Sequence, residues 1–286
     1  MLTDELNAFA GSLSGLAHKT RSRYLNHLEL YLNWLAVEHL HAGQARTVDM
    51  LAFIDSQKKN YSPEQQHRII HSLKAWYTFK EYKRNPARGI RIRYSTSKVP
   101  SGLLDRKALD KLYHDYEATT ILVYRNKVII GLLVFQGLTS GELKRLQVDD
   151  IKLEKGEIYI RSTQQTNSRT LKLEASQILE MKTYLEEFRP QFEKQTNQFI
   201  IHRKGKGTEI QNLLNHLFAA LKKTNPNIKH AGQLRQSVIT EWLKEKDVRV
   251  VQYLAGHKKV KSTERYTSHH LEDLQEQLNT FHPLKL

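Results

Sequence analysis

One short stretch departs from the hydrophobic pattern that governs the rest of the chain. In IKLEKGEIYIRSTQQTNSRTLKL, residues 151–173, apolar and polar residues alternate around Ile158 and again around Leu171. Alternation with a period of two is typical of β-strands, and Lys155-Gly156 is typical of a turn. Elsewhere apolar residues recur at the three-to-four spacing of helices. The chain is therefore predicted to be mainly α, with one small three-stranded antiparallel β-sheet.

The first 90 residues are predicted to form an all-helical domain. Thr20 is predicted to cap one helix, a second is expected over residues 48–54, and a third from Ser62-Pro63 to Phe79. Asn85-Pro86 then disfavours helix, because the residue before proline avoids helical dihedral angles. These features predict a domain over residues 1–90.

A basic segment, GIRIRYSTSKVPSG, follows at residues 89–102. Its small residues and Pro100 indicate a linker, which we place at 91–102, whose basic side chains contact phosphates. An ordinary solvated connector is the alternative. The second domain is expected to cover residues 103–286.

This second domain is expected to be helical around the small sheet. Leu103-Leu104-Asp105 reads as a capped helix start, and the apolar run 121–135 as a buried helix. Helical spacing resumes at Ala175 and at Glu209.

Composition narrows the function classes. No apolar run approaches the roughly 18–20 residues that span a bilayer, and no secretory signal is recognisable. Cysteine is absent, which excludes disulfides and Cys-based zinc sites and is compatible with the cytoplasm. The net charge of +15 divides as +7 in residues 1–100 and +8 in the rest. Because both halves are basic, a polyanion is the expected partner, and nucleic acid is the foremost candidate.

Four features occur in a fixed order along the second half. GLTSGELKRLQVDDI (137–151) precedes the predicted hairpin, GQLRQSVITEWLKE (232–245) follows it, and VRVVQYLAGHKKVKSTERYT (248–267) ends with Tyr266 nine positions after His257. This order resembles the tyrosine recombinases, or phage-type integrases. The N-terminal helices resemble that family's SAM-like core-binding domain, which clamps DNA, and residues 103–286 resemble its catalytic domain.

The resemblance implies a reaction at phosphorus. Tyr266 is the implied nucleophile, forming a 3′-phosphotyrosyl link with DNA and releasing a 5′-hydroxyl. Arg235 matches the second of two arginines that clamp the scissile phosphate, and His257 matches a histidine that hydrogen-bonds it. No metal or cofactor is implied.

At three positions this chain lacks the catalytic residue typical of the family, and a fourth position carries a glutamine. Thr139 stands where the family has its first phosphate-clamping arginine. Gln164, or its neighbour Gln165, stands where it has the hairpin lysine that acts as general acid. Gly232 replaces a histidine, and Gln236 occupies a position that is often histidine or lysine. Losing one such donor typically slows a reaction by roughly 10²–10³, so strand cleavage is expected to be slow or absent unless other groups substitute.

Four residues are conceivable substitutes. Arg161, Arg169 and Lys172 belong to the predicted hairpin, and His230 lies two residues before the vacant histidine position. Each has an ordinary alternative role as a DNA-backbone contact or an exposed charge. A partner subunit could also supply groups in trans.

Two functions therefore remain open: an active site-specific recombinase, and a catalytically weak or inactive DNA-binding accessory or regulatory factor that works with an active partner recombinase. The expected partner is double-stranded DNA at a recombination site, in a cytoplasmic, nucleoid-associated setting. The resemblance implies two protomers per site and four in a synapse, linked by a tail helix over 271–284. The basic residues expected to contact DNA are Arg21, Arg23, Arg91, Arg93, Lys98, Lys258 and Lys259.

Overall fold

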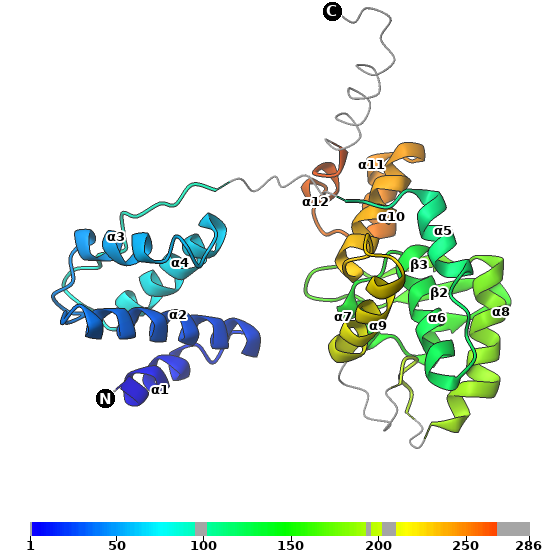
Figure 1. The fold of residues 1–286 in the computed structure, drawn as a ribbon, viewed down its shortest axis with the longest axis horizontal. Helices are drawn as coiled ribbons and strands as arrows, with labels where there is room; N and C mark the ends of the chain where they lie inside the picture. The colour runs from blue at the N-terminus through cyan, green and yellow to red at the C-terminus, as the bar shows by residue number, and fades with distance from the viewer. Residues whose placement is uncertain (1, 95–101, 193–195, 202–209, 268–286) are drawn as a thin grey trace, which may run out of the picture. The chain divides into compact units, whose positions relative to one another are not determined.

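The computed structural model describes residues 2–94, 102–192, 196–201 and 210–267. The chain divides into two compact units, residues 1–98 and 99–286, and the division falls within the expected linker (Figure 1). Within the described residues, no helix is both long and apolar enough to cross a membrane. The expected tail helix and Lys98 lie outside the described residues.

The N-terminal unit is all-helical, as predicted. Its helices are α1 (Leu2–Ser12), α2 (His18–Val37), α3 (Thr47–Ser56) and α4 (Pro63–Phe79). At the start of α4, the Ser62 hydroxyl accepts from the amide of Gln65, whose side chain accepts from the amide of Ser62. The predicted start at Ser62-Pro63 is thus confirmed, and a reciprocal capping box stabilises it.

The start of α2 differs from the prediction. The helix begins at His18 rather than after Thr20, and no side chain caps it. Instead, the carbonyl of Ala17 accepts from the amides of Thr20 and Arg21. Helix α1 was not predicted from the sequence.

Aromatic rings fill the core of this unit. Tyr31 lies edge-on to Phe53 and to Trp76, and its hydroxyl is 2.8 Å from that of Tyr77. The Tyr77 hydroxyl donates to the carbonyl of Ala42 at 3.0 Å. Two phenols are thus buried with their hydrogen bonds satisfied inside an apolar cluster.

The C-terminal unit surrounds one small sheet with helices. The strands are β1 (Ile151–Lys152), β2 (Glu157–Ile160) and β3 (Arg169–Lys172), antiparallel in the order β1-β2-β3, which confirms the predicted sheet. The helices are α5 (Arg106–His114), α6 (Ile121–Val134), α7 (Ser140–Arg145), α8 (Ala175–Thr183), α9 (Ile210–Thr224), α10 (Ala231–Glu245), α11 (Val248–Ala255) and α12 (Lys261–Glu264).

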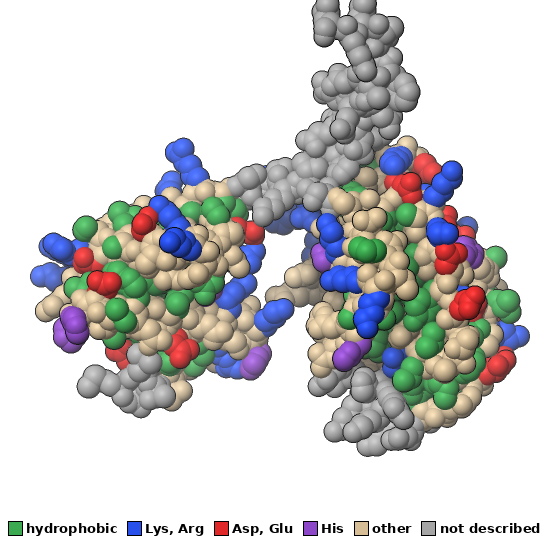
Figure 2. Space-filling view, viewed as in Figure 1, with side chains coloured by type: hydrophobic (Ala, Val, Ile, Leu, Met, Phe, Trp, Pro, Cys, Tyr) green, Lys and Arg blue, Asp and Glu red, His purple; other side chains and the backbone are tan. Residues whose placement is uncertain are grey.

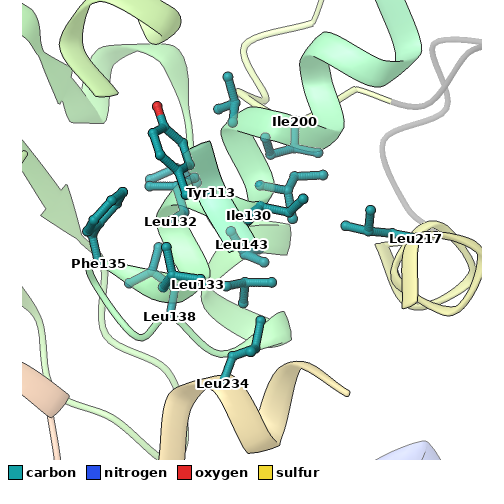
Figure 3. Close-up of a cluster of buried hydrophobic side chains, with 14 of the residues drawn as sticks. Tyr113, Ile130, Leu132, Leu133, Phe135, Leu138, Leu143, Ile200, Leu217 and Leu234 are labelled. Atoms are coloured by element: carbon teal, nitrogen blue, oxygen red, sulfur yellow. The ribbon is translucent and has the colours of Figure 1, made fainter. Parts of the chain in front are cut away.

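Helix α6 is the centre of this unit's core. Its residues Ile130, Leu132 and Leu133 are fully buried, and Figure 3 shows them near Leu138 and Leu234. Beyond α6 the chain turns at Gly137, where φ is +58°. A side chain there would be strained and would press on Val238 of α10. This turn brings the start of α7 against α10, where the candidate site lies.

Candidate active site

A buried carboxylate organises the site. Glu142 of α7 has no exposed side-chain surface. Its Oε2 accepts from the amide and the hydroxyl of Thr139, which caps α7, and its Oε1 accepts from the hydroxyl of Thr166. Burial would raise the pKa of Glu142, but the hydrogen bond and charge of Arg169 outweigh it and hold the pKa below its ordinary range.

Arg169 is the main counter-charge of Glu142. It begins β3, its side chain is fully buried, and its Nη1 donates to Glu142 Oε1 at 2.6 Å. Its Nε donates to the carbonyl of Leu254 at the end of α11. Arg169 therefore joins three elements, the sheet, α7 and α11.

Gly256 closes over this guanidinium. It ends α11 with φ +69°, and a Cβ at this position would lie 2.9 Å from the guanidinium carbon of Arg169. Both the backbone angle and the contact favour glycine. The Gly256-His257 step of the sequence is thus explained by close packing on Arg169.

Arg235 approaches the same carboxylate from α10. Its Nη1 donates to the carbonyl of Gly137 and its Nη2 to the carbonyl of Ala255, each at 2.6 Å. Nη1 also lies 3.9 Å from Glu142 Oε2. About a tenth of the side chain is exposed, and burial lowers its pKa against the opposing charge of Glu142. Arginine keeps its charge in such settings, so the site holds a fixed cation.

The hairpin turn is fastened to this assembly. Thr163 and Thr166 bond to each other through backbone and hydroxyl groups, which leaves Gln164 and Gln165 exposed at the tip. The amide of Asn167 donates to the carbonyl of Gly256 at 2.8 Å, and Thr166 forms an isolated β-bridge with His257. The turn and the segment after α11 therefore hold each other in place.

His257 is held by hydrogen bonds at its ring and backbone. Nδ1 lies 2.8 Å from the hydroxyl of Thr263, a fully buried residue of α12. The backbone amide and carbonyl of His257 bond to the carbonyl and side chain of Gln252. Burial, and then the charge of Arg235, lower the pKa of His257 to about 4. The imidazole is therefore neutral at pH 7.

Tyr266 lies beside His257. Its ring is parallel to the imidazole within 7°, with centroids 6.3 Å apart, and only 2% of the residue is exposed. It packs with Ile239, Val251 and Ala255 in a small apolar cluster. The Arg265 guanidinium donates to the Tyr266 hydroxyl at 2.7 Å and lies over the Tyr266 ring, 4.8 Å from its centroid.

Comparison with known proteins identifies the family. Residues 103–272 match the model of the phage integrase family. The chain belongs to this family, the tyrosine recombinases. It is 28% identical to tyrosine recombinase XerC of Oceanobacillus iheyensis over 91% of this chain and 88% of the relative. It is 26% identical to tyrosine recombinase XerD of Listeria monocytogenes over 94% of each chain.

A solved structure shares the fold. The XerH site-specific recombinase bound to palindromic difH substrate, in a post-cleavage complex, superposes with a TM-score of 0.77 at 19% identity, covering 96% of this chain and 83% of that one. The resemblance to tyrosine recombinases is therefore confirmed at the level of family and fold.

Within this tyrosine recombinase, the two sides of the candidate site differ. On the α10–α12 side, Arg235, His257 and Tyr266 come together. On the α7–hairpin side, Thr139 uses its amide and hydroxyl to bind Glu142, and the Gln164 side chain is exposed at the turn. Neither contributes a positive charge.

Gly232, where the family pattern has histidine, faces another histidine. The His230 side chain caps α10 by accepting from the amide of Gln233 at Nδ1. A Cβ on Gly232 would lie 3.1 Å from that Nδ1 and 3.4 Å from Cε1. The His230 ring thus lies beside the vacant position, whereas Gln236, half-buried, lies one helical turn further along α10.

The other conceivable substitutes are differently placed. Arg161 donates through Nε to both carboxylate oxygens of Asp150 at 3.0 Å, with 45% of its side chain exposed. Lys172 is exposed at the opposite end of β3 from Arg169, paired in register with Glu157. Arg169 is enclosed between Glu142 and Gly256. The structure therefore does not gather these three cations at one point.

The residues expected to contact DNA are largely exposed. Arg21 is half-buried on α2, and the exposed members are Arg23, Arg91, Arg93, Lys258 and Lys259. Figure 2 shows Lys and Arg side chains on the displayed face of both units.

Sequence reasoning missed two side chains of the site. Glu142 lies within GLTSGELKRLQVDDI and Arg265 directly before Tyr266, but the sequence pattern assigns a role to neither. A glutamate three residues after a threonine is a capping-box signal, and it marks the position of Glu142. Nothing in the sequence assigns the hydrogen bond of Arg265 to the phenol.

Proposed function

We propose that the protein is a site-specific DNA recombinase that cuts and rejoins DNA strands through a 3′-phosphotyrosyl intermediate at Tyr266. The convergence of Arg235, His257 and Tyr266 from α10, the turn after α11 and the end of α12 carries this proposal. The rings of His257 and Tyr266 stack, and the charge of Arg235, which lies 22 positions before His257 in the sequence, acts on His257.

The proposed reaction is an in-line displacement at phosphorus. The Tyr266 oxygen bonds to the phosphorus as its proton leaves to solvent. The bond from phosphorus to the 5′-oxygen breaks, and that oxygen takes up a proton from solvent. Arg235 offsets the charge that gathers on the nonbridging oxygens. His257, neutral at pH 7, donates a hydrogen bond to one of them from the ring nitrogen that does not contact Thr263. Attack by another strand's 5′-hydroxyl reverses these steps and rejoins DNA.

DNA as the partner is supported by charge and by the relatives. The net charge is +15, exposed basic side chains occur on both units, and XerH was solved on its difH substrate. We propose assembly as two protomers per recombination site and four in a synapse. Affinity for duplex DNA is expected to fall steeply with salt, because bound phosphates release counterions.

Covalent trapping tests the function. Genomic fragments that the protein binds would be rebuilt as duplexes nicked just beyond each candidate cleavage site, so that the severed end diffuses away. We expect a denaturation-resistant protein–DNA adduct from the wild type and none from Tyr266→Phe. Tyr159→Phe, which alters an exposed tyrosine of β2, is the matched control and should retain the adduct. No adduct from the wild type on any bound duplex would contradict the proposal.

A second function is favoured by one observation, the uncharged residues Thr139 and Gln164 at two positions where the family pattern has cations. Thr139 is held by Glu142 and Gln164 is uncharged. A protein that occupies the DNA site and completes an assembly with an active partner recombinase needs no cleavage of its own. Salt-sensitive binding without an adduct, together with faster recombination by an added active relative, would establish this function instead.

A further inference from the structure

The pocket lacks a cation where the family pattern has its first arginine. Thr139 occupies that position and is bound to Glu142, and Arg169 is enclosed with no exposed side-chain surface. Negative charge gathers on the phosphate in the transition state. Among the residues assigned by the resemblance, Arg235 alone carries a positive charge to offset it. A second positive group is needed for efficient cleavage.

Arg265 lies where it can supply this second positive group. It follows α12 directly and is exposed, so a ligand can approach it from solvent. Its Nη2 is 2.7 Å from the Tyr266 hydroxyl, the atom that would attack phosphorus, and its guanidinium lies over the ring of the same tyrosine. A hydrogen bond from a charged donor is stronger than one between neutral groups.

The charges of Arg265 and Arg235 both lower the pKa of His257. After burial, the charges of Arg235 and Arg265 are the next two causes of the lowered pKa of His257. Arg265 also contributes, after burial and nearer charges, to the lowered pKa of Arg235. Both guanidinium groups therefore act on the His257 ring, which stacks on Tyr266.

We propose that Arg265 is a catalytic residue that supplies the second positive charge of the phosphate pocket, in place of the arginine absent at Thr139. This rests on the proposed function and adds a residue to it. In the reaction, Arg265 holds the phenol oxygen in position and offsets the negative charge that gathers on the nonbridging oxygens as the new phosphorus–oxygen bond forms beside it. No atom is transferred to or from Arg265.

The test compares adduct formation by full-length Arg265→Gln and wild type on the nicked duplex at saturating DNA. We expect the rate to fall by roughly 100- to 1000-fold, the typical effect of losing one such donor, with the dissociation constant for DNA changed little. Arg265→Lys should restore part of the rate because it restores the charge. Arg249→Gln, which removes an exposed arginine from α11, is the charge-matched control and should leave the rate near wild type.

A second substrate separates charge from structure. A duplex with a neutral methylphosphonate at the scissile position carries less negative charge, so Arg265→Gln should recover most of its deficit there, which a misfolded variant would not do. A variant rate within threefold of wild type on the phosphodiester, or an equal deficit on both substrates, would overturn the assignment of Arg265 alone. No wild-type adduct on either substrate would overturn the proposed function, and this inference with it.

Discussion

The two units solve the problem of buried polar groups in opposite ways. Among the described residues, the N-terminal unit buries only neutral polar side chains, Gln57, Gln66 and Ser72, together with the hydroxyl pair of Tyr31 and Tyr77. The C-terminal unit buries charged ones. They are Arg125, Glu142, Asp150, Arg169, Arg189 and Arg235.

This difference indicates that the core of the N-terminal unit serves packing, whereas the buried charges of the C-terminal unit hold site residues in fixed positions. Desolvated charges are expensive, and an apolar replacement is often as stable. The charges around Glu142 therefore indicate a role beyond stability, which is to hold Arg235 and the Gly256-His257 turn in fixed positions. The N-terminal unit, whose surface rather than its core carries the basic residues, has no such requirement.

The largest expected effect comes from breaking the charged cluster. Glu142→Ala leaves Arg169 and Arg235 buried without their carboxylate and should lower the free energy of unfolding of the C-terminal unit by about 3–5 kcal/mol. Denaturant unfolding followed by circular dichroism measures it. Glu154→Ala, at an exposed glutamate of the same unit, should change little. Equal losses in both variants would remove the distinction drawn between the units.

Gly256→Ala should be the next most damaging change. The left-handed backbone costs about 1–2 kcal/mol for a residue with a Cβ, and overpacking on Arg169 adds about 1–3 kcal/mol. Gly156→Ala is a matched control, because Gly156 also has positive φ but its Cβ would meet only the end of the Ile178 side chain at 3.3 Å. The difference between the losses of unfolding free energy in the two variants measures the cost of the contact with the Arg169 guanidinium. Equal losses would mean that the Arg169 side chain moves aside without cost.

Breaking the neutral hydroxyl pair of Tyr31 and Tyr77 should lower the free energy of unfolding by a smaller amount. Tyr77→Phe removes the hydroxyl that links Tyr31 to the carbonyl of Ala42 and should destabilise the N-terminal unit by about 1–3 kcal/mol. Unfolding can be followed by the fluorescence of Trp76 in a variant that lacks Trp34 and Trp242. A loss as large as that of Glu142→Ala would show that charge is not what distinguishes the two cores.

The smallest effect is a pH dependence that both units share. The pKa of His27 is lowered to about 4 by burial and then by Arg23 and Arg68, and the pKa of His257 is lowered to about 4 by burial and then by Arg235. Between pH 6.5 and 4 the unfolded chain binds more protons than the fold. Stability should therefore be complete above pH 6.5 and decline towards pH 4, with a shallow slope because solvent screens the charges around these partly exposed rings.

Paired variants assign this pH dependence. His27→Gln should flatten the decline in the N-terminal unit alone, and His257→Gln in the C-terminal unit alone. Stability that rises as the pH falls through this range would contradict both assignments.

The fold could be predicted from the sequence because its signals are local. Ser62-Pro63 marked the start of α4, Asp105 capped α5 as expected, and the change of period near Ile158 marked the sheet. Helix α2 was misplaced because the backbone carbonyl of Ala17 replaced the expected side-chain cap.

The interior of the site depends on contacts that sequence spacing does not reveal. Glu142 and Arg169 are 27 positions apart, and the contact of Gly256 with Arg169 joins two turns. The motif order identified which residues to consider, but it could not indicate that Arg169 is enclosed or that Arg265 reaches the Tyr266 hydroxyl. Such facts follow from how the elements pack.

The ring of His230 beside Gly232 affects which substitutions could restore the family pattern in this chain. A lysine in place of Gln164 would stand at an exposed tip, so a single substitution suffices there. A histidine at position 232 would bring its Cβ to 3.1 Å from His230 Nδ1, so the ring that caps α10 would have to shift by a few tenths of an ångström. We therefore expect the effect of a histidine at position 232 to depend on the residue at position 230.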